Sequence, residues 1–227
     1  MSKKTVFFLI ISIIFIDQFS KIYVKLNFLP SETVNVIGDW FQLHFVENEG
    51  MAWGWKFGGD FGKILLTLFR LGAVIWGTFL IRDFIEKKYH KGFIICAALI
   101  YAGALGNLID SMFYGLIFDS SCLSNGKNCY VLANAFAGKG YSSFLHGKVV
   151  DMLYFPLFKG TIPSWSPIWN GEPFIFFSPV FNIADASISI GVITIFVFQN
   201  WFFKKAENTA PKTVETNIVV DDNTQVM

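Results

Sequence analysis

Residues 92–118 read GFIICAALIYAGALGNLIDSMFYGLIF, and this stretch decides the fold class. No charged side chain precedes Asp110 in it. A helix needs about 20 mostly apolar residues to cross the hydrocarbon core of a bilayer. The stretch meets both conditions, so it predicts a transmembrane helix.

Three further apolar runs, 5–29, 61–81 and 179–203, are long enough or nearly so to span a membrane. Hydrophobic residues make up 53% of the 227-residue chain and charged residues only 15%. A soluble domain of this size needs more charge to cover its surface. The sequence therefore predicts an all-α polytopic membrane protein with four transmembrane helices. The formal net charge of +1 gives no basic patch, so no nucleic-acid partner is expected.

The first run could also be read as a cleavable signal peptide, because Lys3 and Lys4 precede it. No small-x-small cleavage site follows, and Asp17 and Lys21 stand where the apolar core would end. A retained span is the better interpretation.

Positive residues flank the spans on one side. They are Lys3, Lys4, Arg82, Lys87, Lys88, Lys91, Lys204 and Lys205. By the positive-inside rule both termini are then cytoplasmic, and the connections 30–60 and 119–178 lie outside. Residues 1–205 form the membrane domain, and the polar tail 206–227 is expected to be disordered. The alternation in 40–46 predicts a small extracytoplasmic β element.

Polar residues gather at one depth in the predicted spans. At a rise of about 1.5 Å per residue, those in three spans lie roughly 18–28 Å from the cytoplasmic end. They are Asp17, Lys21, Asn107, Asp110 and Asp185, and Asn182 stands three residues before Asp185 on the same face of the fourth span. Arg70 sits near the middle of its span. Ionisable groups inside spans are costly and are functional suspects.

The spacing places these groups on common helix faces beside small residues. Asp17 and Lys21 are four apart, which allows an ion pair on one face. Gly103 and Ala184 accompany the acids of the third and fourth spans, and small residues let helices approach closely in lipid. A polar pocket among packed helices, open toward the outside, is the expected result.

Such a pocket holds carboxylates and carboxamides. Two adjacent carboxylates share a proton, so one can activate water while the other protonates a carbonyl oxygen. On the residues alone, Asp110 is the more obvious partner of Asp185. Three alternatives stay open here: a transporter or channel that relays protons or cations, a Mg²⁺ or Ca²⁺ site, and a structural role.

Five short motifs occur in order along the chain. They are Asp17-Gln18-Phe19-Ser20-Lys21, Asn48-Glu49-Gly50-Met51-Ala52-Trp53-Gly54, the stretch from Gly103 to Asp110, Val149-Val150-Asp151, and Phe181-Asn182-Ile183-Ala184-Asp185. In this set and order the chain resembles the lipoprotein signal peptidase (signal peptidase II) family, with extended outer loops.

The resemblance implies an aspartic endopeptidase that removes signal peptides from diacylglyceryl-modified prolipoproteins just before the lipidated cysteine. It implies Asp151 and Asp185 as the catalytic pair, without cofactor or metal. The implied substrate-binding or supporting residues are Asp17, Lys21, Asn48, Gly50, Gly103, Asn107, Asp110, Asn182 and Ala184. The expected partners are the lipid-modified substrate and membrane lipids, and the expected state is a monomer. The expected location is the bacterial inner membrane, with the active site near its outer face.

Three features depart from the family pattern. Ser111 stands where an arginine usually follows the motif acid, and Lys148 or Lys139 could supply the missing charge. The chain also has long insertions at 116–147 and 156–178, whose role the sequence does not reveal. Cys122 and Cys129 lie in the first insertion, on the side expected to be oxidising, and are predicted to form a disulfide, whereas Cys96 is expected to pack in its span.

Overall fold

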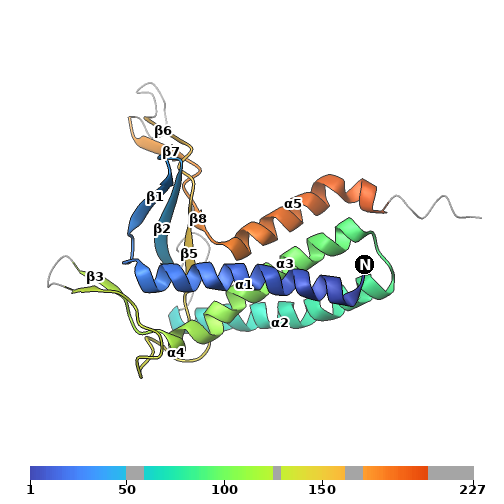
Figure 1. The fold of residues 1–227 in the computed structure, drawn as a ribbon, viewed down its shortest axis with the longest axis horizontal. Coiled ribbons are helices and arrows are strands. Elements are labelled where there is room, and N and C mark those ends of the chain that lie inside the picture. The colour runs from blue at the N-terminus through green and yellow to red at the C-terminus, as the bar shows by residue number, and fades with distance from the viewer. Residues whose placement is uncertain (50–58, 125–128, 162–170, 204–227) are drawn as a thin grey trace, which may run out of the picture.

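Long helices run side by side in the computed structural model, and a β-sheet stands across one end of them (Figure 1). The structure describes residues 1–49, 59–124, 129–161 and 171–203. Within these residues, four helices are long and apolar enough to cross a membrane. They are α1 (Lys3–Asn27), α2 (Gly59–Glu86), α3 (Lys91–Ile109), which continues helically to Ile117, and α5 (Ile183–Phe203). The four predicted long apolar helices are therefore confirmed.

Two of these spans differ from the sequence expectation in their outer parts. After α3 the chain adopts a π-helical segment, η2 (Asp110–Tyr114), before the short α4 (Gly115–Ile117). A π turn holds an extra residue and often marks a functional site. Here it keeps Asp110, Ser111 and Tyr114 all buried. The fourth span begins later than position 179, because residues 180 and 181 belong to a strand.

The sheet has four antiparallel strands in the order β1-β2-β5-β8. Their bounds are β1 (Thr33–Ile37), β2 (Phe41–Asn48), β5 (Val149–Tyr154) and β8 (Val180–Phe181). The predicted strand at 40–46 is β2, but the sheet is larger than expected because distant segments pair, as in Val46 opposite Asp151. A buried core that includes Val24, Phe45 and Phe118 packs the sheet against α1 and α4.

The two insertions form hairpins beyond the sheet. One consists of β3 (Cys122–Ser124) and β4 (Cys129–Val131), the other of β6 (Phe158–Thr161) and β7 (Pro173–Phe176). The first insertion returns onto the helix end, where Gly147 N donates to Ser111 O over 2.9 Å. Cys122 is disulfide-bonded and Cys96 is a buried free thiol. The side chain of Cys129 and the tail 204–227 lie outside the described residues.

Small residues bring α3 and α5 into backbone contact. A Cβ atom on Gly103 would lie 2.2 Å from the carbonyl oxygen of Ala184. A Cβ on Gly106 would lie 2.8 Å from Oδ2 of Asp17. Glycine at 103 therefore lets α3 and α5 meet at this distance, as the small-residue pattern predicts, and glycine at 106 leaves room for the Asp17 side chain of α1.

Candidate active site

Asp151 and Asp185 reach the site from different elements that meet at the sheet end of the bundle. Asp151 lies on β5, between β2 and β8, and only 3% of it is exposed. Asp185 lies in the first turn of α5 and is half-buried. Because β8 pairs with β5 through Phe181 and Leu153, α5 begins beside the Asp151 strand.

Asn182 connects the two acids. It stands between β8 and α5, where its Oδ1 accepts from the Asp185 amide over 2.9 Å, as an N-cap does. Its Nδ2 donates to Asp151 Oδ1 over 2.7 Å. One buried carboxamide therefore binds the side chain of the first acid and the backbone of the second.

Two further carboxamides orient the same pair. Asn107 Nδ2 donates to Asp185 Oδ1 over 2.8 Å, and Asn48 Nδ2 donates to Asp151 Oδ2 over 3.0 Å. Asn182 Nδ2 also lies 3.2 Å from Asn107 Oδ1. The three predicted asparagines thus converge on the two acids.

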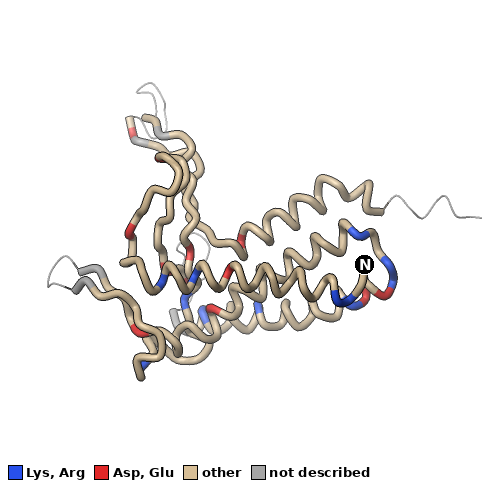
Figure 2. The backbone as a smooth tube through the Cα atoms, in the orientation of Figure 1, with Lys and Arg blue, Asp and Glu red and all other residues tan. Residues whose placement is uncertain are grey.

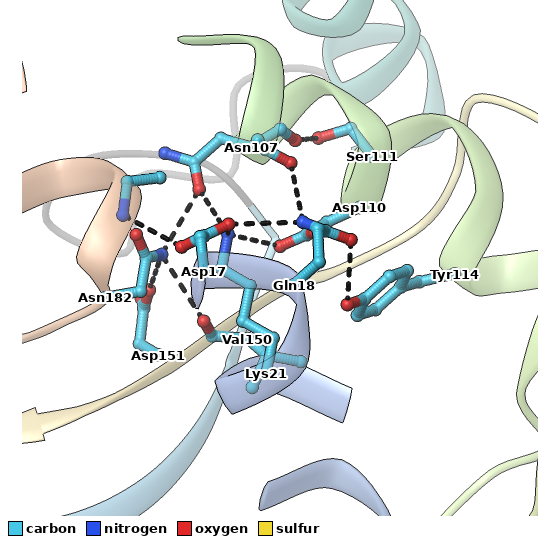
Figure 3. Close-up of polar contacts among 12 residues, drawn as sticks. Asp17, Gln18, Lys21, Asn107, Asp110, Ser111, Tyr114, Val150, Asp151 and Asn182 are labelled. Atoms are coloured by element: carbon cyan, nitrogen blue, oxygen red, sulfur yellow. Dashed lines mark hydrogen bonds and ion pairs between the residues drawn. The ribbon is translucent and has the colours of Figure 1, made fainter. Parts of the chain in front are cut away.

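Lys21 occupies the neighbouring part of the polar layer (Figure 3). Its Nζ lies 2.9 Å from Asp17 Oδ2, 2.8 Å from Asp110 Oδ2 and 2.8 Å from Asn107 Oδ1. The ammonium group therefore forms ion pairs with two carboxylates and donates a hydrogen bond to one carboxamide. Asp110 is fully buried in this ion pair, which separates it from the acids that the asparagines orient.

Asp17 joins the first and last spans. Its Oδ1 accepts from the backbone amide of Ala184 over 2.8 Å, one residue before Asp185. Gly103 packs on the same turn of α5. The structure therefore brings together every predicted site residue except Gly50, which lies outside the described residues.

Comparisons with known proteins agree with this arrangement. The family model for "Signal peptidase (SPase) II" matches residues 9–202. The chain belongs to the signal peptidase II family. It is therefore a membrane peptidase of aspartic type that removes signal peptides from prolipoproteins.

Individual relatives and one solved structure agree with the family assignment. A lipoprotein signal peptidase from Porphyromonas gingivalis is 45% identical over 196 residues, which cover 86% of this chain and 82% of that protein. One from Amoebophilus asiaticus is 37% identical and covers 79% of this chain and 71% of that one. A solved bacterial membrane enzyme shares the fold, with a TM-score of 0.55 at 22% identity over 92% of this chain and 95% of that one.

The pKa of the Asp151 carboxyl group is raised above its usual value. Burial raises it to about 7, and the negative charge of Asp185 adds to the rise. The hydrogen bonds from Asn48 and Asn182 and the charge of Lys21 act in the opposite direction. Near neutral pH the carboxyl group can therefore hold or release a proton.

Two further polar side chains, for which the sequence predicted no role, contact residues of this site. Gln18 Nε2 donates to Asp110 Oδ1 over 2.8 Å, and Arg70 Nη1 donates to Ser111 Oγ over 3.0 Å. The position of Gln18 next to Asp17 in its motif was the available signal. For Arg70 it was a charge inside a span.

A second ion-pair network lies where the sheet meets α1. The buried Lys25 pairs with Glu47, and Lys148 Nζ lies 3.2 Å from Glu47 Oε2. These positive charges lower the pKa of Glu47 against the opposing effect of burial. Lys148 is thus engaged by Glu47, and the residue that contacts Ser111 is Arg70. Of the two lysines suggested as substitutes for the usual arginine, Lys148 is thus paired with Glu47.

Proposed function

We propose that Asp151 and Asp185 are the catalytic pair and that the enzyme cuts diacylglyceryl-modified prolipoproteins just before the lipidated cysteine. The observation that carries this proposal is the carboxamide of Asn182, which holds both residues at once. Asp110 is the competing acid, and its place in the Lys21 ion pair argues against a role as proton carrier.

The chemistry follows from the different surroundings of the two acids. Two carboxyl groups in such a site share one proton, and the burial that raises the pKa of Asp151 favours that proton on it. Asp185 lies in the first turn of a helix, where the helix dipole favours negative charge. Asp185 then takes a proton from the attacking water, while Asp151 protonates the carbonyl oxygen of the scissile bond.

A proton or cation relay is the rival role for these acids. In the described part of the chain, the Lys21 ammonium sits between Asp17 and Asp110, the place where a transported cation would bind. Because Lys21 already fills this position with a fixed positive charge, the arrangement favours peptide hydrolysis over cation transport.

The distribution of charge supports the orientation. Lys and Arg positions gather at the turn between α2 and α3 and at the start of α1, opposite the sheet (Figure 2). By the positive-inside rule this end is cytoplasmic. The sheet and the catalytic pair then lie near the outer face of the bacterial inner membrane, with both termini in the cytoplasm.

The substrate lipid stays in the bilayer in this proposal, and its peptide enters the polar layer from the side. In the second insertion Phe174, Phe176 and Phe177 are exposed, as suits the membrane interface, whereas Trp165 and Trp169 lie outside the described residues. Acyl burial contributes roughly 0.8 kcal/mol per CH₂ group, so an unlipidated precursor should be a poor substrate. We propose that the monomer is sufficient, because both acids come from one chain.

The test is cleavage of a lipidated precursor peptide by the purified full-length protein. Asp151→Asn and Asp185→Asn should each lower turnover by about 10³ or more while the protein stays folded. Asp39→Asn is the control, since Asp39 is an exposed acid on the sheet side. Near-normal turnover in either dyad variant would refute the assignment, and equal cleavage of lipidated and unlipidated precursor would refute the proposed lipid recognition.

A further inference from the structure

Arg70 carries a positive charge from α2 into the acid-rich layer. Its Nη1 donates to Ser111 Oγ over 3.0 Å, and that hydroxyl donates to Asn107 O over 2.9 Å. At about 1.5 Å per residue, Arg70 lies roughly 24 Å along α2 from Glu86, and Ser111 lies roughly 30 Å along the next span from Lys91. The side chain therefore extends toward the sheet end to reach its partner.

The positive charge of Arg70 matters because the site contains several carboxyl groups. The described part of the layer contains four carboxyl groups, and the Lys21 ammonium lies between two of them, Asp17 and Asp110. The negative charges of Asp185, Asp110 and Asp151 all act on the Arg70 guanidinium. These acids come from α5, η2 and β5, so three different elements contribute negative charge that acts on the guanidinium.

Ser111 explains how an arginine on another helix can reach this point. The residue is 2% exposed, and its short side chain provides an acceptor for the guanidinium. An arginine at position 111 would instead bring its own charge from the π-helical segment. In this chain α2 provides the positive charge, Arg70, and η2 provides the hydroxyl that binds it, Ser111.

We propose that Arg70 is a positioning residue of the catalytic pair: held by Ser111, its guanidinium stabilises the state in which Asp151 and Asp185 together carry one negative charge. This inference rests on the proposed catalytic pair. Without the nearby cation the negative charge is disfavoured, the pair takes up a second proton more readily, and the group that activates water is lost.

The experiment measures turnover of a lipidated precursor peptide against pH, with the purified full-length protein. Arg70→Gln should shift the acidic limb of the profile to higher pH by about one pH unit and lower turnover below that limb. Arg70→Lys keeps the charge and should shift the limb much less. Arg70→Gln combined with Ser111→Arg moves the guanidinium to the other end of the hydrogen bond and should restore the profile. Arg82→Gln, at an exposed position on the same helix, is the control and should behave as wild type.

The outcomes separate this inference from the catalytic assignment. An acidic limb unchanged in Arg70→Gln would overturn the role of Arg70, whatever its effect on thermal stability. So would equal impairment of Arg70→Lys and Arg70→Gln, or a double variant as impaired as Arg70→Gln alone. Full activity in Asp151→Asn or Asp185→Asn would instead refute the catalytic pair itself.

Discussion

The side-chain amide of Asn182 donates to Asp151 Oδ1 over 2.7 Å, and the same side chain caps the helix that carries Asp185. Asn182→Ala removes both contacts. We expect turnover to fall by about 10- to 100-fold and stability by about 2–4 kcal/mol, through loss of a cap and of a buried hydrogen bond.

The measurement pairs cleavage kinetics with thermal unfolding. Asn35→Ala is the control, because Asn35 is exposed and its side chain donates to the exposed Asp39. If Asn182→Ala loses stability but keeps full turnover per folded molecule, then Asn182 ties the elements together without orienting the acids.

Asp151→Asn should change how stability depends on pH. The pKa of Asp151 is about 7 in the folded protein, above the value near 3.9 expected after unfolding. The contribution of Asp151 to the free energy of unfolding is then fully present below about pH 4. Up to about 4 kcal/mol of this free energy is lost as the pH rises through 7. Asparagine does not titrate, so the variant avoids this loss. The melting temperature of the variant relative to wild type should be higher at pH 8.5 than at pH 4.5, and a difference independent of pH would contradict the raised pKa.

Gly103→Ala should separate the third and last spans. The new Cβ would lie 2.2 Å from a backbone oxygen of α5, so the helices must move apart and the bond from Asn107 to Asp185 must lengthen. We expect a lower melting temperature and a loss of turnover of at least about tenfold, because overpacking costs about 1–3 kcal/mol. Gly72→Ala is the matched control, since nothing lies within 4 Å of its added Cβ. Similar melting temperatures and activities in the two variants would disprove the tight contact.

Glu47→Gln should destabilise the protein strongly, because it leaves the buried Lys25 without its counter-charge. Breaking a buried pair from one side costs about 3–5 kcal/mol, whereas removing both partners costs less. The double variant Lys25→Met/Glu47→Gln should therefore recover part of the melting temperature. Glu172→Gln, at an exposed position, should have little effect. No recovery in the double variant would show that the pair is not the source of the loss.

The spans and most of the polar layer could be predicted, because both depend on regular helical spacing. The ion pair between Asp17 and Lys21 follows from their separation by one helical turn, and the structure places them 2.9 Å apart. The contact of α3 with α5 follows from Gly103. Such features depend on the spacing of residues within a single helix, so the sequence alone predicts them.

The choice between Asp110 and Asp151 could not be made from spacing, because it depends on which acid pairs with Lys21. Asp151 enters the site only through the pairing of β2 with β5, strands about a hundred residues apart in sequence. The π-helical segment that buries Asp110 together with Ser111 left no recognisable pattern. Arg70 was visible as a charge inside a span, but its partner lies on another helix.

The hydrogen bond between Asp17 and the Ala184 amide has a consequence for biosynthesis. It joins residues 167 positions apart, one from the first span and one from the last. Asp185 and Asn182 also arrive only with the final span, so a nascent chain has neither its second acid nor the carboxamide that orients the first. With Asp151 and Asp185 as the proposed catalytic pair, proteolytic competence begins only when the last helix is inserted.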